Sequence, residues 1–445
     1  MNLENISPID GRYQKDTEEF SKFFSESALI RYRVMLEIEY LIALAKEKNF
    51  VQVKNFSKEE KKTLRNIYQS FNLDDAEQIK TIEDVTKHDV KAVEYFLQTK
   101  FVELGFEEFI SFIHFALTSE DINNLAYTLS FKHALQKVYL PQIKKVVEIL
   151  LLQANQYKNL AMLSMTHGQP ATPTTLGKEL LVYVNRLERQ IKKLESHSFA
   201  GKLNGAVGNF AAHHFAVPEV DWKKFSTDFV NFLGLEPLLL STQVNSYDSL
   251  VESFMIVSHI NIILSDLAKD MWLYISRGIF SQVVQENEVG SSTMPHKINP
   301  INFENAEGNV SIANSLFNCL IDKLPQSRMQ RDLSGSTIIR NQGVALAHAL
   351  LVAKNIVKGL NKVIPNIEKI KSELDNNFEV VTEALQTILR KNGNRDAYEK
   401  IKNLSRGKHL TRQDFLEFVE TLDLPLVDKV KLQMLTPESY TGLIF

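Results

Sequence analysis

The sequence contains very little cysteine. Among its 445 residues Cys319 is the single cysteine, so no internal disulfide can form and no cysteine pair stands at metal-binding spacing. This usage favours a reducing compartment, and we expect a cytoplasmic protein. The N-terminus, MNLENISPIDGRY, lacks a basic stretch followed by an apolar core, so it does not look like a secretory signal.

An excess of positive charge is also missing. The formal net charge is −3 and the pI is near 6.4, whereas a dedicated nucleic-acid binder needs basic residues to neutralise phosphates. The most hydrophobic segment, residues 254–275, is interrupted by His259, Asp266, Lys269 and Asp270, which makes it a poor transmembrane span. We therefore expect neither a nucleic-acid nor a membrane partner. We expect residues 254–275 to form a helix that is buried inside a bundle.

Several well-known binding motifs are absent. Gly201, Gly205 and Gly208 do not have the spacing of a dinucleotide loop, and there is neither a glycine-rich phosphate loop nor an HExxH zinc motif. The adjacent His213 and His214 would point to different faces of a helix, which makes them a poor metal pair. We expect no metal and no cofactor.

Proline is sparse, and this favours long helices because proline breaks helix interiors. Hydrophobic residues make up 44% and charged residues 24%, as in ordinary folded proteins. The longer stretches without proline are residues 9–140, 174–217, 238–294, 326–364 and 366–424.

Periodicity also indicates helices. Ile143, Val146, Val147 and Leu150 follow the i, i+3, i+4, i+7 pattern of an amphipathic helix, and strand-like alternation is scarce. Helix starts are predicted where a capping hydroxyl precedes an acid by three residues, at Ser57 with Glu60 and at Thr411 with Asp414. The sequence predicts an all-α protein.

A length of 445 residues suggests about three domains at roughly 150 residues each. No linker or repeat marks their edges. We expect an N-terminal helical domain over 1–111, a central bundle of long helices over 112–364, and a C-terminal helical domain over 365–445.

One loop is dense in hydrogen-bond donors. Residues 290–300 read GSSTMPHKINP, and such hydroxyl, lysine and asparagine groups suit a developing anion. Composition alone would favour an ordinary polar surface loop. However, the string matches the signature loop GSSxMPxKxNP of the fumarase, aspartase and argininosuccinate lyase superfamily, and His296 resembles the adenylosuccinate lyase form.

Other strings support the same resemblance over most of the chain. TSEDINN (118–124) and THGQPA (166–171) are similar to superfamily motifs. Further strings resemble the longer bacterial adenylosuccinate lyases: SPIDGRY (7–13), HDVKAVEYFL (88–97), GKLNGAVGN (201–209) and SRMQRDL (327–333).

This resemblance implies a lyase that eliminates fumarate from adenylosuccinate, giving AMP, and from the succinylated aminoimidazole carboxamide ribotide of purine biosynthesis. The partners would be purine nucleotide substrates and further copies of the chain, in a homotetramer with shared active sites. Such an elimination removes a carbon-bound proton and protonates the departing nitrogen, so it needs an acid, a base and anion stabilisation.

The resemblance assigns the proton-transfer roles. His167 would be the general acid, which suits a side chain that ordinarily titrates near neutrality, and Ser291 the base. Lys297 would stabilise the anion and Glu304 would orient the histidine. Read alone, His167 fits a structural histidine, Glu304 an exposed helical residue, and Ser291 an unpromising base, since a hydroxyl needs strong activation.

The nucleotide half of the substrate carries a phosphate, for which arginine is a natural clamp. An arginine such as Arg340 on a solvated helix face is the plainer alternative. The positions that match the family's substrate contacts are Arg12, Tyr13, His88, Asp89, Thr118, Ser119, Gln243, Asn299, Asn305, Arg331, Ser336 and Arg340.

The chain also departs from the family pattern. Met165 stands in place of arginine before THGQ, Lys87 in place of asparagine before HDV, and residues 242–248 read TQVNSYD instead of TQIEPHD. The alternatives are another lyase of the superfamily, such as argininosuccinate lyase or a carboxymuconate-type cycloisomerase, and a non-enzymatic relative. Arginines at the phosphate positions argue against the first, and retention of the acid–base set argues against the second.

Overall fold

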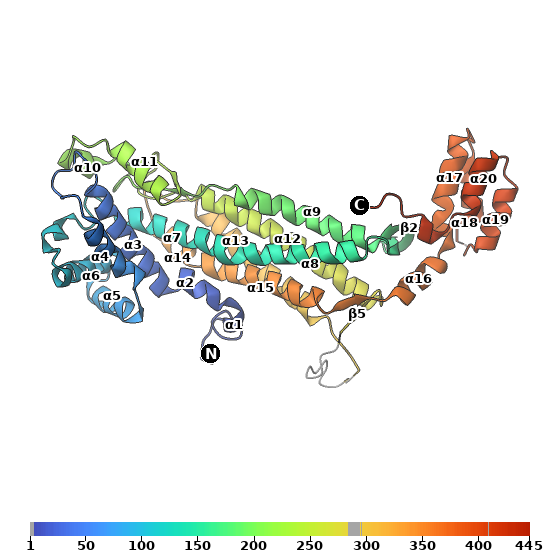
Figure 1. The fold of residues 1–445 in the computed structure, drawn as a ribbon, viewed down its shortest axis with the longest axis horizontal. Coiled ribbons are helices and arrows are strands. Elements are labelled where there is room, and N and C mark those ends of the chain that lie inside the picture. Colours follow the sequence, from blue (N-terminus) through green and yellow to red (C-terminus); the bar gives the residue numbers. More distant parts are fainter. Residues whose placement is uncertain (1–3, 284–293, 295, 408) are drawn as a thin grey trace. The chain divides into compact units, whose positions relative to one another are not determined.

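The computed structural model describes residues 4–283, 294, 296–407 and 409–445, and most of them are helical (Figure 1). The predicted all-α class is confirmed. By compactness the chain divides into two units, residues 1–143, 190–262 and 308–354, and residues 144–189, 263–307 and 355–445. The division into three consecutive domains stays a prediction.

The first unit contains most of the N-terminal elements. They are α1 (Gln14–Thr17), η1 (Glu18–Phe20), α2 (Ser21–Phe24), α3 (Glu26–Leu44), α4 (Lys58–Gln69), α5 (Leu73–Thr86), α6 (Asp89–Leu104), η2 (Glu107–Phe112), α7 (Ser119–Ala134), η3 (Leu135–Tyr139), β3 (Ala200–Gly201), α10 (Ala211–Ala216), α11 (Trp222–Phe232), β4 (Glu236–Pro237) and α14 (Ser334–Ile339).

Longer helices contribute residues to both units: α8 (Leu140–Gln156), α9 (Leu176–Glu195), α12 (Asp248–Ser276), α13 (Ile301–Lys323) and α15 (Gln342–Leu360). The second unit adds β1 (Ala161–Thr166), β2 (Gln169–Thr175), β5 (Phe280–Gln282), β6 (Val363–Pro365), α16 (Ile367–Asp375), η4 (Phe378–Val381), α17 (Thr382–Lys391), α18 (Ala397–Ser405), α19 (Arg412–Glu420), α20 (Leu426–Gln433) and η5 (Pro437–Ser439).

Local sequence signals explain the helix boundaries. The Ser57 side chain accepts the Glu60 N–H at 3.2 Å, and the Glu60 carboxylate accepts the Ser57 N–H at 2.7 Å, which starts α4. The same reciprocal pair at Thr411 and Asp414 starts α19. Both predicted helix starts are confirmed. The predicted amphipathic helix is confirmed as well, because residues 143, 146, 147 and 150 are buried on one face of α8.

The helix α7 continues into α8 through the π turn η3, where the Leu140 N–H bonds to the Leu135 carbonyl. This wider turn ends at Tyr139, two residues before Pro141, whose ring would otherwise meet the carbonyl of the preceding turn. The only proline between Pro8 and Pro170 therefore interrupts the α-helical hydrogen bonding without ending the helical run.

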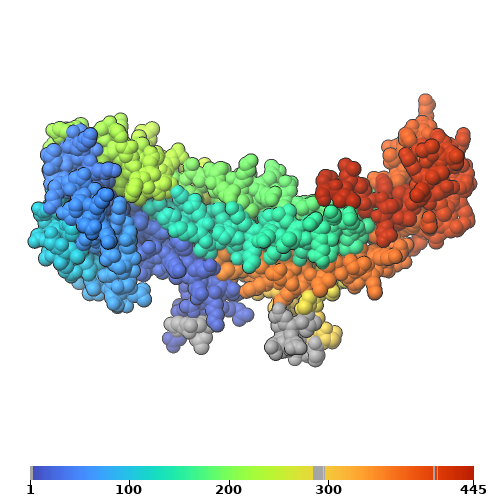
Figure 2. Space-filling view, in the orientation of Figure 1, coloured from blue at the N-terminus to red at the C-terminus, as the bar shows by residue number. Residues whose placement is uncertain are grey.

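The first-unit helices α4, α5 and α6 pack against α3. A buried carboxylate fixes one of these contacts, because Glu39 accepts Arg65 Nε at 2.7 Å and Nη2 at 2.8 Å, and also the Tyr68 hydroxyl at 2.7 Å. Such a bidentate pair sets orientation as well as distance. Figure 2 shows one face of the surface that these helices form, coloured in blue and cyan.

The β1–β2 hairpin is a feature that the sequence pattern did not reveal. Residues 161–166 pair antiparallel with residues 169–175, with a register shift between Leu163 and Ser164. The prolines at 170 and 173 obscure the strand pattern, because proline cannot donate to a ladder and is tolerated only at edges or bulges. His167 and Gly168 form the turn, with φ of +52° and +71°.

Two helical stretches, 248–276 and 334–360, are long and apolar enough to cross a membrane by length and composition. However, 61% and 83% of their most hydrophobic windows are buried within the protein. Phe254, Val257 and Ile260 of α12 are fully buried. The predicted helix inside a bundle is confirmed.

A buried ion pair lies where α7 meets the loops after β3 and β4. Lys202 Nζ is 3.0 Å from Asp121 Oδ1, and both side chains have no exposed surface. The ammonium also donates to the carbonyls of Gly205 at 3.1 Å and Gln243 at 2.8 Å. All three ammonium hydrogens thus have acceptors, which a buried lysine requires.

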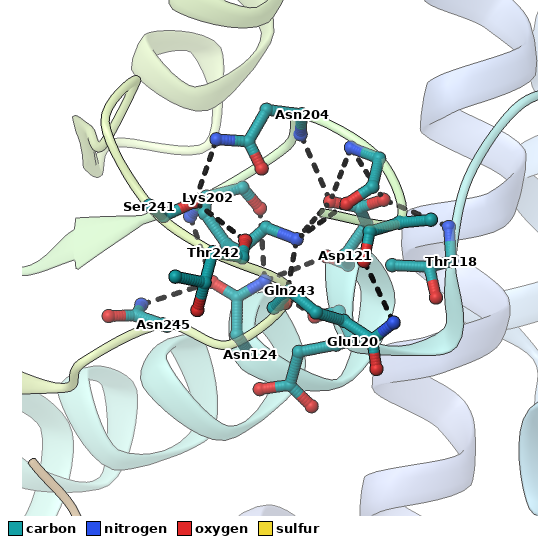
Figure 3. Close-up of polar contacts among 12 residues, drawn as sticks. Thr118, Glu120, Asp121, Asn124, Lys202, Asn204, Ser241, Thr242, Gln243 and Asn245 are labelled. Atoms are coloured by element: carbon teal, nitrogen blue, oxygen red, sulfur yellow. Dashed lines mark hydrogen bonds and ion pairs between the residues drawn. The ribbon is translucent and has the colours of Figure 1, made fainter. Parts of the chain in front are cut away.

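Amides complete this network, which Figure 3 shows from one side. Asn124 Nδ2 donates to the Lys202 carbonyl at 2.9 Å, and Asn124 Oδ1 accepts the Lys202 N–H at 2.9 Å. Asn204 and Gly205 donate backbone N–H groups to Asp121. Asn245 Nδ2 donates to Asn124 Oδ1 at 3.1 Å. Residues 118–124, 201–205 and 241–245 are therefore locked together.

We expect Lys202→Met to lower the free energy of unfolding by about 3–5 kcal/mol, because it leaves the Asp121 carboxylate buried without its cation. The matched control is Lys224→Met, since Lys224 pairs with Asp228 at the surface, where solvent screening makes such a pair contribute little. Thermal denaturation of both variants measures the difference. Equal melting temperatures for the two would contradict the assigned role of Lys202.

Candidate active site

A cavity of about 390 Å³ lies in the first unit, against α7 and the C-cap of α5. Its wall combines residues from three stretches that are far apart in the sequence, 83–127, 244–247 and 324–340. The predicted substrate contacts that line it are His88, Asp89, Ser119, Arg331, Ser336 and Arg340.

The ends of two helices place residues in the cavity. Thr118 is the N-cap of α7, and its backbone N–H donates to Asp121 Oδ2 at 2.9 Å, so the buried ion pair also fixes the start of this helix. His88 caps α6 by accepting the Lys91 N–H on Nδ1 at 3.1 Å. This bond leaves Nε2 as the protonated nitrogen of a neutral His88.

Asp89 organises the cations at one side of the cavity. Its Oδ2 accepts Arg33 Nη2 at 2.6 Å and lies 3.6 Å from Arg340 Nη2. Arg33 is buried and also donates to Asn123 Oδ1 at 2.8 Å. Burial alone would raise the pKa of Asp89, but the charge of Arg33, the hydrogen bond from the Val90 N–H and the charge of Arg340 together outweigh it and hold the pKa below the ordinary value.

Lys87 adds a further charge to the cavity wall. It ends α5 in the left-handed conformation, with φ of +54°. Asparagine tolerates this conformation better than lysine does, so the departure from the family's usual asparagine costs some backbone strain. The substitution places a lysine side chain next to His88 in the cavity wall.

The second arginine of the cavity, Arg331, is held from the loop after β4. Its Nη1 donates to Gln243 Oε1 at 2.9 Å, while Gln243 Nε2 donates to the Ala206 carbonyl at 2.8 Å. The neighbouring Thr242 hydroxyl donates to the Gln330 carbonyl at 3.0 Å. Gln243 thus links the buried network to the arginine.

Sequence reasoning missed Glu120 and Tyr247, which lie side by side in the cavity wall. The Tyr247 hydroxyl donates to Glu120 Oε1 at 3.0 Å, and both residues are buried. Burial raises the pKa of Glu120, and the charge of Arg331 and the bond from Tyr247 oppose that rise. The signals available were the position of Glu120 within TSEDINN and the departure at Tyr247.

Arg12 and Tyr13 are not among the residues that line the cavity. Tyr13 precedes α1, and its N–H donates to the Pro8 carbonyl at 2.9 Å, which fixes the turn over residues 8–13. Arg12 is exposed.

The remaining predicted residues belong to the second unit. His167 is exposed at the tip of the β1–β2 hairpin, and Lys297 is exposed before α13. Glu304, in the first turn of α13, accepts Trp272 Nε1 at 3.1 Å, so its contact here is with α12 rather than with His167. Asn299 precedes α13 and Asn305 lies in its first turns. Ser291 lies outside the described residues.

Among residues 4–283, 294, 296–407 and 409–445, no group of three or more His, Cys, Asp or Glu side chains could hold a metal ion. The cavity instead offers guanidinium, ammonium, hydroxyl and carboxylate groups. Guanidinium groups of this kind bind phosphates and carboxylates.

Comparisons with known proteins identify the family. The family model "Lyase" matches residues 11–312, and the model "Adenylosuccinate lyase C-terminal" matches residues 327–441. Adenylosuccinate lyase of Legionella pneumophila is 47% identical, with 99% of this chain and 97% of the relative covered. The chain belongs to the adenylosuccinate lyase family. Another lyase of the superfamily is therefore not favoured.

Other members of the adenylosuccinate lyase family are similarly close. The enzyme of Dictyostelium discoideum is 47% identical over 100% of this chain and 97% of its own length, and that of Escherichia coli K12 is 44% identical over 99% and 97%. Fumarate lyase from Mesorhizobium sp. BNC1 shares the fold, with a TM-score of 0.74 at 16% identity and 96% and 95% coverage. The 3-carboxy-cis,cis-muconate lactonizing enzyme from Pseudomonas putida has a TM-score of 0.72 at 19% identity and 96% and 94% coverage.

We expect Asp89→Asn to lower the free energy of unfolding by about 3 kcal/mol at pH 7, since the buried Arg33 loses its carboxylate. Because the pKa of Asp89 is lowered on folding, its contribution is present above about pH 4 and fades as the pH falls further. Melting temperatures of wild type and variant at pH 7 and pH 3.5 measure this. The difference in melting temperature between wild type and Asp89→Asn should be smaller at pH 3.5 than at pH 7. The surface variant Asp228→Asn is the control. An equal difference at both pH values would contradict the assigned role of Asp89.

Proposed function

We propose that this protein removes fumarate from adenylosuccinate, leaving AMP, and from the succinylated aminoimidazole carboxamide ribotide, leaving the carboxamide ribotide. The observation that carries the proposal is the cavity in the first unit, where six residues predicted to contact a purine nucleotide lie together. Full-length identity of 44–47% to adenylosuccinate lyases supports the same substrates. The reaction serves AMP and IMP biosynthesis.

The anions of the substrate and the cations of the cavity are complementary. A phosphate fits beside Arg331, Arg340 and Ser336, because guanidinium groups and a hydroxyl supply several donors to one anion. The succinyl carboxylates would meet Thr118 and Ser119 at the start of α7, where helix N–H groups favour negative charge.

The elimination moves two protons. The nitrogen is bonded to one carbon of the succinyl group, and a base takes a proton from the neighbouring carbon. The electron pair of that C–H bond forms the double bond of fumarate. The electron pair of the C–N bond leaves with the nitrogen. We assign the base to Ser291 and the acid that protonates nitrogen to His167, with Lys297 stabilising the anionic intermediate. Glu304 would orient His167 across a subunit boundary, since within this chain it contacts Trp272.

A homotetramer with active sites shared between subunits is part of the proposal. One face of α12 supports a contact with another helix, because Met255, Ile262 and Leu273 are 51%, 53% and 51% exposed. Ile262 and Leu273 follow Met255 by seven and eighteen residues, which are close to two and five full helical turns, so all three lie on one side of the helix. Large contiguous apolar patches mark protein interfaces, and we propose that this face of α12 belongs to such a patch. The single cysteine supports a cytoplasmic location.

We expect purified protein to release fumarate from both succinylated nucleotides, because both carry the phosphoribosyl and succinylamino groups that these residues hold. Absorbance and chromatography with each substrate at saturation provide the measurement. Activity on one substrate alone would disprove the dual role. Activity on neither, with argininosuccinate as a comparison, would overturn the proposed function.

Mixing two inactive variants tests the shared sites. His167→Ala and Ser291→Ala should each lower turnover by about 10²–10⁴-fold, as loss of a general acid or base typically does. After dissociation and reassembly of an equal mixture, about a quarter of the sites should contain neither lesion if the two residues come from different subunits. Each variant treated alone is the control. A mixed oligomer without recovered activity would show that one subunit supplies both groups.

A further inference from the structure

The carboxylate of Glu120 is unusual among those that line the cavity. It is only 6% exposed, and its one hydrogen bond within the described chain comes from the Tyr247 hydroxyl. Asp89 by contrast pairs with Arg33, and Glu83 with Lys80. Among the residues described, no arginine or lysine lies within hydrogen-bonding distance of the Glu120 carboxylate. This carboxylate can therefore accept further hydrogen bonds.

The chain holds this pair in place by a strained conformation. Tyr247 has φ of +58°, which is rare for a bulky residue. Its N–H donates to Asn245 Oδ1 at 2.8 Å, and Asn245 in turn donates to Asn124 of the buried network. Strain of this kind persists where the surroundings fix it, and it gathers at functional sites. Asn245 and Tyr247 are also positions where the chain departs from TQIEPHD.

A buried carboxylate in a cavity built for anions restricts what part of the substrate it can meet. An ionised carboxylate accepts hydrogen bonds and donates none, so it cannot approach the phosphate or the succinyl carboxylates. Hydroxyl groups are the natural partners. The ribose diol is the set of hydroxyls that both proposed substrates share, and carboxylates bind ribose hydroxyls in other nucleotide sites.

We propose that Glu120 accepts hydrogen bonds from the ribose diol of the nucleotide, with Tyr247 as the residue that positions it. The inference rests on the proposed function and adds a specificity determinant to it. Glu120 lies one residue from Ser119 and shares the cavity wall with Arg331, so a sugar bound here would stand between the succinyl and phosphate contacts. The enzyme would then select ribonucleotides over nucleotides that lack the diol.

The test compares adenylosuccinate with its 2′,3′-dideoxy analogue. We expect wild type to prefer the ribonucleotide by about 10²-fold or more in kcat/KM, because two hydrogen bonds to a charged group are lost with the analogue. Glu120→Gln keeps the shape but replaces an acceptor with a donor. It should lower kcat/KM for the ribonucleotide at least about tenfold, and leave the dideoxy substrate nearly unchanged.

Two further variants sharpen the result. Tyr247→Phe should reduce the preference by a smaller factor, through KM rather than kcat, since it frees the carboxylate without removing it. Glu94→Gln is the matched control, because Glu94 is 8% exposed, pairs with Lys91 and does not line the cavity. Its preference should equal that of wild type. Melting temperatures confirm that each variant is folded.

Equal losses for both substrates in Glu120→Gln would overturn the inference, because Glu120 would then act on Arg331 or on the fold. Absence of a preference in wild type would overturn it as well. Calorimetric binding of AMP and 2′,3′-dideoxy-AMP gives a readout that does not require turnover. Wild type that binds AMP more tightly than the dideoxy form, yet releases no fumarate, would refute the proposed reaction and leave the ribose contact standing.

Discussion

The buried pair of Lys202 and Asp121 is the interaction on which the candidate site depends. Two charges without exposed surface are costly unless every polar atom finds a partner. Here the ammonium binds one carboxylate and two carbonyls, and the carboxylate also accepts backbone N–H groups from Thr118, Asn204 and Gly205. These contacts join the start of α7 to the segments that contain residues 204–205 and 243, so the pair links the three segments that support the site.

The pair also fixes the positions of residues that line the cavity. Fixing the Thr118 N–H sets the first turn of α7, and with it Ser119 and Glu120. Fixing the Gln243 carbonyl places its side chain to receive Arg331. The polar groups that line the cavity therefore rest on the pair of Lys202 and Asp121, neither of which lines it. A site held by such a support need not reorganise when the ligand arrives.

Much of the fold could be predicted because its signals are local. The capping hydroxyl and acid at residues 57 and 60, and the apolar face of α8, follow from hydrogen-bonding and burial rules that act within a few residues. The β1–β2 hairpin was not predicted, since its prolines hide the strand pattern. The hairpin forms because the backbones of β1 and β2 pair with each other, and not because its residues have a high intrinsic preference for strands.

The site could be predicted only where a motif names it. His88, Ser119, Arg331 and Arg340 were identified by resemblance, and the structure brings them to one cavity. Lys202 stands in a quoted motif, but nothing in the sequence shows that this lysine is fully buried, because lysines are usually exposed. The same holds for Arg33, which lies outside every motif and yet anchors Asp89. Long-range partners of this kind are fixed by the tertiary fold.

The cavity contains carboxylates although its proposed substrates are anions, and the contacts explain why. Arg340 lies near both Asp89 and Glu26, so its guanidinium is oriented before any phosphate binds. The neighbouring guanidinium groups keep the pKa of Asp89 low in spite of its burial, so this carboxylate is an anion that balances their charge. A cavity of unpaired arginines would attract anions more strongly, but it would also repel itself and lose side-chain order. Balanced charges weaken the attraction somewhat and supply the defined geometry that stabilising a transition state requires.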